Sequence, residues 1–244
     1  MITVYSLSCL IMKFETVVKE VIPRTLDTSS FRFFRPADFT YKPGQYIMVT
    51  IKSDEKELLH PFSLSSSPTE PEFIEFTKKL TTSEYSTRLK SMKPLDWATI
   101  DGPYGKFTCE CEYEKIIFFA GGIGITPFFS IIKYCIDNKL GTSIILFYGA
   151  RNQNEIAFKK ELDEMQGKNP HLKVIYVLNE PLLGWTGKTG FVSVDLVKEE
   201  VPDYRDRVFY ACGPPAMVTA MQRTVNSMGL PDTQLRLESF IGHT

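Results

Sequence analysis

The hydrophobic pattern of this chain changes once, near residue 111, and this change constrains the fold more than any other feature of the sequence. Before it, apolar residues form short runs separated by turn signals such as Lys-Pro-Gly at 42–44. Six short runs at close spacing predict a small antiparallel β-barrel. The predicted strands are 14–21, 31–35, 45–52, 62–65, 73–79 and 98–101, with one helix at 83–91.

After residue 112, continuous apolar runs alternate with helical stretches, a pattern typical of strands covered on both faces. It predicts a doubly wound α/β unit with a parallel sheet. The predicted strands are 115–120, 143–148, 173–178 and 207–211, and the predicted helices are 127–138, 154–165, 193–199 and 215–228. We therefore expect two domains, residues 1–111 and 112–244. The uncharged residues 1–11 either form a peripheral strand or lie before the true start of translation at Met12.

Charge and composition exclude several classes of protein. Lysine plus arginine number 28 and aspartate plus glutamate 29, so the net charge of −1 provides no basic field for nucleic acid. Residues 116–132 are uncharged, but their glycines and proline favour a buried strand, turn and helix over a membrane span. The histidines and cysteines lack metal-ligand spacing, so no metal is expected. The odd cysteine set, which predicts reduced thiols in a cytoplasmic protein, comprises Cys9, Cys109, Cys111, Cys135 and Cys212.

The stretch 120–127 combines the end of an apolar strand with a glycine-rich turn and a helix start. Gly121, Gly122 and Gly124 let the backbone approach a ligand, and Thr126 and Pro127 are expected as the N-cap and first residue of a helix. Free amides and the helix dipole would stabilise a pyrophosphate there. The alternative is a tight turn packed for its own sake, since the spacing is not Gly-x-Gly-x-x-Gly.

A second loop of the same design follows the last predicted strand, with Cys212, Gly213 and Pro214 before a helix. Ligands of open α/β sheets bind at the carboxyl ends of the strands, so both loops are expected to face one site. Cys212 would lie at its floor. The alternative reading of Cys212 is a small buried hydrophobic residue.

In the barrel half, one extended stretch carries His60, Pro61, Phe62 and Ser63. An aromatic ring followed by hydroxyls can stack on a planar ring and form a hydrogen bond with its edge. A plain edge strand would have the same composition, so this stretch alone does not decide between the two.

In their order, these motifs resemble the ferredoxin–NADP reductase family of flavoenzymes from about Met12 onward. The stretches that carry the resemblance are 41–46, 60–63, 83–87, 102–107, 121–127, 148–151 and 212–215. It implies an FAD-dependent NAD(P)H oxidoreductase, with FMN as the less favoured flavin and NADPH or NADH as substrate. Hydride would pass to the flavin, and electrons would go to ferredoxin, flavodoxin, an oxygenase component or a ferric chelate.

The resemblance also implies roles for individual residues. Ser63 and Cys212 would border the reacting rings and are the expected catalytic residues. The expected flavin contacts are His60, Pro61, Phe62, Ser63, Ser83, Ser86 and Thr87. For the pyridine nucleotide, the expected contacts are Gly121, Gly122, Gly124, Thr126 and Pro127 at the pyrophosphate, Arg151 at the adenosine, and Cys212, Gly213 and Pro214 at the nicotinamide.

Two places depart from the family pattern. His60 replaces the arginine expected on the flavin phosphate, and the His-Pro-Phe-Ser stretch is similar to that of the ferric reductase and NADPH oxidase branch. Arg88 or Lys90 could take over this charge. Near the end of the chain, Glu238 could relay a proton and Phe240 could shield the flavin, while ordinary core and surface roles stay open for both.

Two questions stay open at this stage. The chain could be an electron-transfer subunit or a nucleotide-sensing module without independent turnover. The basic Arg151 favours NADPH slightly, because a 2′-phosphate needs cationic partners near the end of the second strand of the nucleotide domain.

Overall fold

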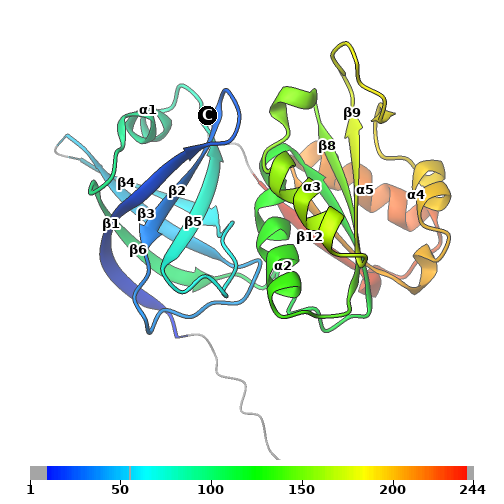
Figure 1. Ribbon diagram of the computed structural model, residues 1–244, viewed down its shortest axis with the longest axis horizontal. Helices are drawn as coiled ribbons and strands as arrows, with labels where there is room; N and C mark the ends of the chain where they lie inside the picture. Colours follow the sequence, from blue (N-terminus) through cyan, green and yellow to red (C-terminus); the bar gives the residue numbers. More distant parts are fainter. Residues whose placement is uncertain (1–9, 55, 241–244) are drawn as a thin grey trace, which may run out of the picture.

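The computed structural model describes residues 10–54 and 56–240, and within these ranges the chain forms two sheets side by side (Figure 1). The first sheet has the order β4-β3-β6-β1-β2-β5, with antiparallel neighbours throughout. A bridge between Leu64 and Phe76 joins its two edges, which confirms the curled antiparallel domain. Its elements are β1 (Met12–Pro23), β2 (Thr28–Phe34), β3 (Tyr46–Ser53), β4 (Lys56–Ser63), β5 (Phe73–Lys79), β6 (Trp97–Tyr104) and α1 (Glu84–Ser91).

The second sheet is parallel in the order β10-β9-β8-β7-β11-β12. Because β7 lies between β8 and β11, the strand order reverses there, as at the switch point of a doubly wound fold. Its strands are β7 (Lys115–Gly121), β8 (Ser143–Ala150), β9 (Leu172–Leu178), β10 (Lys188–Thr189), β11 (Val208–Gly213) and β12 (Leu235–Ser239). The α/β prediction is therefore confirmed.

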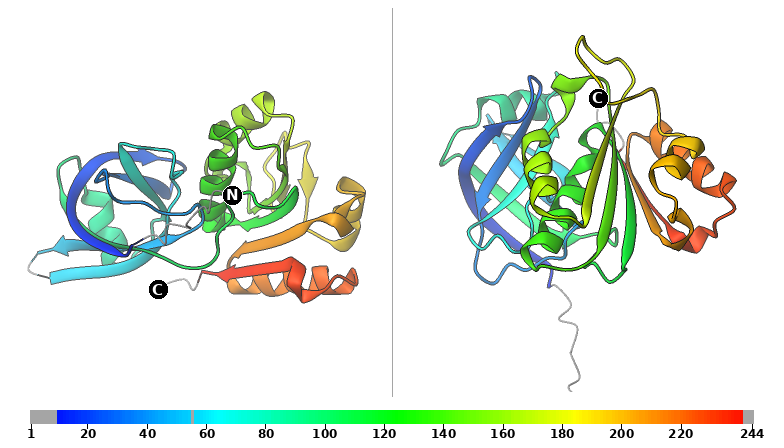
Figure 2. Two further views of the ribbon diagram at one scale, coloured as in Figure 1. Left: turned by 90° about the horizontal axis from the view of Figure 1, so that it is seen from below. Right: turned by 45° about the vertical axis from the view of Figure 1, so that its right-hand side comes forward.

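Helices cover both faces of the parallel sheet. Figure 2 shows α2 and α3 on the side of the barrel and α4 and α5 on the opposite side. The helices are α2 (Ile125–Asp137), α3 (Lys159–Lys168), α4 (Val194–Glu200) and α5 (Pro215–Ser227), with short 3-10 turns η1 (Gly122–Gly124), η2 (Gln153–Glu155), η3 (Tyr204–Asp206) and η4 (Asp232–Gln234). In the part of the chain that is described, no helix is long and apolar enough to cross a bilayer.

The barrel packs directly on helix α2 of the α/β domain. The Ser130 hydroxyl donates to the carbonyl oxygen of Ser66 over 2.6 Å, and both residues are buried. Gly44 has a φ of +97°, and a Cβ there would lie 2.2 Å from the carbonyl oxygen of Phe107. The turn at 42–44 must therefore be glycine-bearing, because it fits closely against the segment that connects the two sheets.

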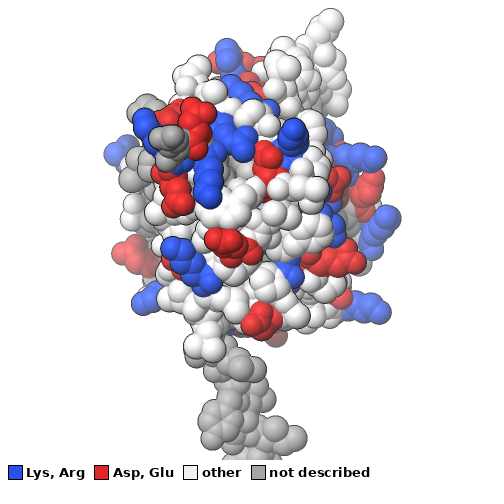
Figure 3. Space-filling view, turned by 90° about the vertical axis from the view of Figure 1, so that its left-hand side faces the viewer, with Lys and Arg blue, Asp and Glu red and all other residues white. Residues whose placement is uncertain are grey.

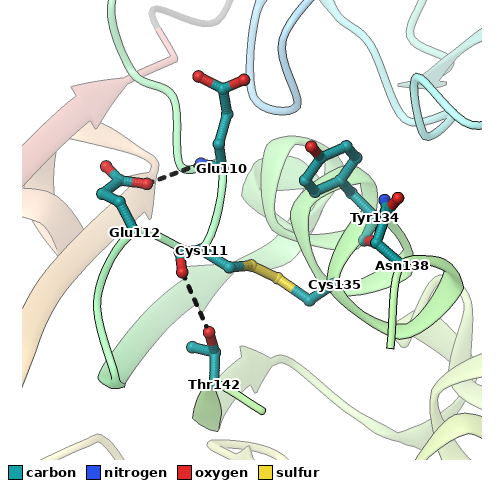
Figure 4. Close-up of a disulfide and its surroundings, with 7 residues drawn as sticks. All are labelled: Glu110, Cys111, Glu112, Tyr134, Cys135, Asn138 and Thr142. Atoms are coloured by element: carbon teal, nitrogen blue, oxygen red, sulfur yellow. Dashed lines mark hydrogen bonds between the residues drawn. A yellow bond between two sulfur atoms is a disulfide. The ribbon is translucent and has the colours of Figure 1, made fainter. Parts of the chain in front are cut away.

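The structure corrects the prediction that the cysteines are all reduced. Cys111 and Cys135 form a disulfide between the connecting segment and α2, with their Cα atoms 6.3 Å apart (Figure 4). Sequence spacing did not reveal the pair, because the two residues meet only when the connecting segment runs past the end of α2. Cys109 and Cys212 are buried free thiols, and Cys9 lies outside the described residues.

Two elements begin several residues away from their predicted starts, and two strands were not predicted. Strand β4 begins at Lys56 rather than residue 62, because its exposed first half lacks an apolar run. Helix α3 begins at Lys159 rather than residue 154, because Phe158 adopts a left-handed φ of 59°. The short edge strands β10 and β12 escaped prediction because edge pairing needs few apolar residues.

Candidate functional site

The two glycine-bearing loops predicted to share one site are in direct contact. Gly124, in the turn after β7, lies so close to the end of β11 that a Cβ there would be 2.2 Å from the carbonyl oxygen of Cys212. The same Cβ would be 2.6 Å from the Cα of Gly213. Because Gly124 has an ordinary right-handed conformation, glycine is required here by space and not by φ.

The helices that follow these loops leave backbone amides available to an anion. At the starts of α2 and α5, no side chain among the described residues caps the first turn. Helix α2 begins at Ile125 after Gly124, so the prediction of Thr126 as N-cap is wrong. Instead, the Thr126 hydroxyl donates to the carbonyl oxygen of Ile123 over 3.1 Å. Pro127 lies in the first turn, where its missing amide breaks no helical bond. A pyrophosphate fits this cradle.

The buried Cys212 and the partly buried Glu238 form a pair beside this cradle. They lie in register on the neighbouring strands β11 and β12, and Cys212 Sγ is 3.8 Å from Glu238 Oε2. Burial is the main cause that raises the pKa of Glu238 to about 7, and burial also raises the pKa of the Cys212 thiol. The backbone amide of Phe240 donates to the carbonyl oxygen of Gly213 over 3.0 Å. Residues 238–240 therefore run alongside the site.

The raised pKa of Glu238 predicts a pH-dependent stability. A carboxyl whose folded pKa exceeds its unfolded value contributes stability that is complete below about pH 4.5 and is lost as the pH rises through about 7. The free energy of unfolding of the flavin-free protein is therefore expected to fall by up to about 3 kcal/mol between pH 4.5 and pH 8 from this group. In urea titrations across this range, Glu238→Gln should lack that contribution. Parallel pH profiles for variant and wild type would contradict the assignment.

The barrel side of the site is aromatic. Phe62 stacks on the buried Phe76, with ring centroids 4.2 Å apart and an interplanar angle of 10°. The His60 ring meets Tyr85 edge-on at 4.5 Å, whereas Pro61 is exposed. Ser63 ends β4 and is 7% exposed. Since β5, which carries Phe76, contacts η1, the barrel stretch and the glycine turn belong to adjoining surfaces.

The start of α1 is a cluster of hydroxyl groups. Ser83 caps the helix by accepting from the amide of Ser86 over 3.3 Å, and the two hydroxyls lie 3.1 Å apart. Ser86 is fully buried and Thr87 is exposed. The Ser86 hydroxyl is thus already bound within the chain, so an anion at this helix would meet backbone amides and Thr87 first.

The two candidate replacements for the missing flavin-phosphate arginine are both engaged within the barrel domain. Arg88 forms an ion pair with Asp96 at 3.0 Å and donates to the carbonyl oxygen of Lys52. Lys90 donates to the carbonyl oxygen of Thr81 over 2.8 Å, which keeps its ammonium group near the start of α1. The Lys90 ammonium therefore lies beside Thr81, just before the first residue of α1.

Sequence reasoning missed two charged residues at this site. The Lys78 ammonium lies 5.9 Å from the centroid of the Phe62 ring, and burial lowers its pKa. A lysine pair at the end of the predicted strand 73–79 was the available signal. Glu180 was also missed, and its Oε2 accepts from Arg151 Nε over 2.6 Å at the carboxyl edge of the sheet. Arg151 is therefore paired with an acid, which the sequence did not indicate.

Comparisons with known proteins agree with this geometry. The oxidoreductase FAD-binding domain family matches residues 13–109, and the oxidoreductase NAD-binding domain family matches residues 118–223. NADH-cytochrome b5 reductase 1 of Dictyostelium discoideum is 34% identical over 216 residues, which cover 86% of this chain and 76% of that protein. The glycine betaine monooxygenase reductase subunit of Pseudomonas aeruginosa is 25% identical over 228 residues, 91% of this chain and 62% of that protein.

The fold matches solved structures over nearly the whole chain. A ferredoxin NADP+ reductase from Neisseria gonorrhoeae with bound FAD and NADP superposes with a TM-score of 0.81 at 19% identity, covering 93% of this chain and 98% of that one. An FAD-binding and an NAD-binding domain therefore follow each other in this chain, in the same order as the two sheets.

Proposed function

Because the chain belongs to the ferredoxin–NADP reductase-like family of flavoproteins, we propose that it passes electrons from NADH through FAD to a protein that carries a one-electron centre. The broader activity, that of an FAD-dependent NAD(P)H oxidoreductase, follows from the family itself. The observation that carries the proposal is the contact of the Gly124 turn with Cys212 and Gly213. It joins two uncapped helix starts into one anion cradle next to an aromatic barrel edge.

The residues present fit both cofactors. We assign Phe62 and Ser63 to the flavin ring and the amides at the start of α1, with Thr87, to its pyrophosphate. The turn at 121–127 would hold the nucleotide pyrophosphate, and Cys212, Gly213 and Pro214 would border the nicotinamide. When bound, FAD supplies the chemistry that accepts a hydride and releases single electrons. The protein contributes orientation and the exclusion of water, since Cys212 is fully buried at the floor.

Below about pH 7, Glu238 is neutral and can share a proton with the Cys212 thiol at the edge of the cradle. A neutral acid at this position avoids a negative charge beside the dinucleotide. We therefore assign the Glu238 carboxyl the role of holding a proton beside Cys212, whose thiol donates to Glu238 Oε2.

The activities for which the relatives are named support the choice of acceptor. One relative is a reductase for cytochrome b5, and another is the reductase subunit of a monooxygenase. Of the acceptors that the sequence suggested, these relatives support an oxygenase component but not ferredoxin. They add a b-type cytochrome, which we propose as the first choice of acceptor. The outer face of the barrel carries both signs of charge intermixed, so it offers no single-sign docking field there (Figure 3).

The function is tested with the purified chain. We expect a yellow protein after incubation with FAD, which bleaches on anaerobic addition of NADH and reduces cytochrome b5 in steady-state assays. A ferricyanide assay separates an autonomous reductase from a subunit that needs its partner, because a small dye requires no docking surface. A preparation that binds neither FAD nor a pyridine dinucleotide would contradict the proposal.

The pair of Arg151 and Glu180 predicts a preference for NADH. Arg151 is the cation nearest the expected adenosine position, but the Glu180 carboxylate lies against it and would repel a 2′-phosphate. Glu180→Gln is expected to raise kcat/KM for NADPH about fivefold, or about 1 kcal/mol, because the repulsion disappears while Arg151 remains. kcat/KM for NADH should change less than twofold, a margin of about 0.4 kcal/mol.

Asp232→Asn is the matched control for that variant. It removes one exposed negative charge at η4, which precedes β12 and so lies at the opposite edge of the sheet. The control should leave both nucleotides unaffected. An unchanged kcat/KM for NADPH in Glu180→Gln would show that the carboxylate does not face the 2′ position.

A further inference from the structure

The barrel holds both helices that follow the expected nucleotide-binding loops. Helix α2 begins at the glycine turn, and α3 follows β8 and Arg151. The barrel contacts α2 through the buried Ser66–Ser130 hydrogen bond and through an ion pair of Glu70 with Lys133 at 3.1 Å. It contacts α3 through a separate group of charged residues centred on Arg24.

Arg24 lies directly after β1 in the barrel, and its guanidinium makes four contacts. Nε donates to the Ser30 hydroxyl over 2.7 Å, and Nη2 lies 3.2 Å from a carboxylate oxygen of Glu75. Nη1 forms an ion pair with Glu161 in the first turn of α3. The centre of the guanidinium is 4.6 Å from the ring centroid of Phe158. The Arg24 side chain is only 9% exposed and that of Glu75 3%, so their contact is shielded from solvent, whereas the Glu161 side chain is 37% exposed and its contact is partly shielded.

The barrel orients Arg24 independently of α3. The Glu75 side chain is 3% exposed and pairs with both Arg24 and Arg32, the latter at 2.8 Å. It also accepts a hydrogen bond from the Ser65 hydroxyl over 2.8 Å. Arg24 therefore keeps a buried carboxylate partner if Glu161 is changed. This separates the contact between domains from the stability of the barrel.

The contact reaches both helices. Phe158, which Arg24 covers, has a left-handed φ of 59° and stacks on Phe129 of α2 with ring centroids 4.1 Å apart. One barrel side chain thus touches the start of α3 directly and α2 through a single ring. A second ion pair, Lys79 with Glu155 at 3.2 Å, connects the end of β5 in the barrel to η2 in the α/β domain.

We propose that Arg24 and Glu161 are positioning residues for flavin reduction, which fix the approach of the nucleotide domain to the barrel. This inference rests on the oxidoreductase activity stated above. Neither residue touches the expected cofactors. They act by holding α3, and with it the Arg151 loop, at a set distance from the barrel edge that carries Phe62. Hydride transfer is sensitive to displacements of this kind, because a shift of about 1 Å can change a rate about 100-fold.

The test compares Glu161→Gln with Glu164→Gln, an exposed position on the same helix. In stopped-flow reduction by NADH, we expect Glu161→Gln to lower the limiting rate about fivefold while the nucleotide Kd stays within about twofold. Glu164→Gln should match the wild type. Normal reduction of the wild type together with an equal limiting rate in Glu161→Gln overturns this inference and leaves the proposed function standing.

A double-mutant cycle shows whether the two residues act through each other. Arg24→Gln leaves Glu75 paired with Arg32, and the double variant Arg24→Gln/Glu161→Gln should be no slower than Arg24→Gln alone. Independent, multiplying effects on the limiting rate would overturn the pairing.

A readout without cofactor completes the test. In hydrogen–deuterium exchange on the flavin-free protein, Glu161→Gln should raise exchange at the start of α3 and in the barrel loop after Arg24. Exchange in β5, which holds Glu75, should not change. Equal exchange at the start of α3 in Glu161→Gln and wild type would overturn the inference.

Discussion

Replacing Gly124 by alanine is expected to slow reduction of the flavin by NADH about 100-fold or more, since it displaces the two loops of the nucleotide site. The added Cβ would lie 2.2 Å from the carbonyl oxygen and 2.5 Å from the carbonyl carbon of Cys212. Both are backbone atoms of a central strand, so they cannot turn aside as a flexible side chain would. The free energy of unfolding should also fall by about 1 to 3 kcal/mol, as for overpacking in other cores.

Gly141→Ala serves as the control for this variant. Among the described atoms, a Cβ at Gly141 meets nothing within 4 Å, and its φ is not left-handed. Stopped-flow reduction and urea unfolding should therefore both resemble the wild type. A Gly124→Ala protein with a normal reduction rate would mean that the turn does not hold the dinucleotide.

Ser63→Ala and Cys212→Ala are each expected to slow flavin reduction about tenfold or more, equivalent to about 1.4 kcal/mol of barrier. Both side chains are buried, Ser63 at the end of β4 and Cys212 at the end of β11. Removing the hydroxyl takes away a hydrogen-bonding group beside the position proposed for the flavin ring. Removing the thiol takes away the partner of Glu238 and leaves a gap at the position proposed for the nicotinamide.

Cys109→Ala is the matched control for Cys212→Ala, because Cys109 is also a buried free thiol but lies in the segment that connects the two sheets. Its loss should lower stability and leave the reduction rate unchanged. If single-turnover reduction in Ser63→Ala and Cys212→Ala proceeds at the wild-type rate, neither residue takes part in the reaction.

Local patterns predicted the elements well where apolar runs are continuous. Strand β5 has the bounds that the sequence predicts, and the central strands of both sheets agree within a few residues. Prediction failed where one residue adopts an unusual conformation, as Phe158 does before α3. It also failed where a strand is exposed, as in the first half of β4. In both cases the deciding contacts come from outside the segment itself.

The sequence by itself determined the order of a curled β-domain and a parallel α/β domain, and the two glycine-bearing turns. These follow from local periodicity and from residues adjacent along the chain. The tertiary structure alone decided which distant residues meet: Gly124 with Cys212, Cys212 with Glu238, and Arg151 with Glu180. The physical reason is that strand order, register and domain packing set these contacts. A hydrophobic pattern repeats identically in many registers, so it does not specify the partner of any one side chain.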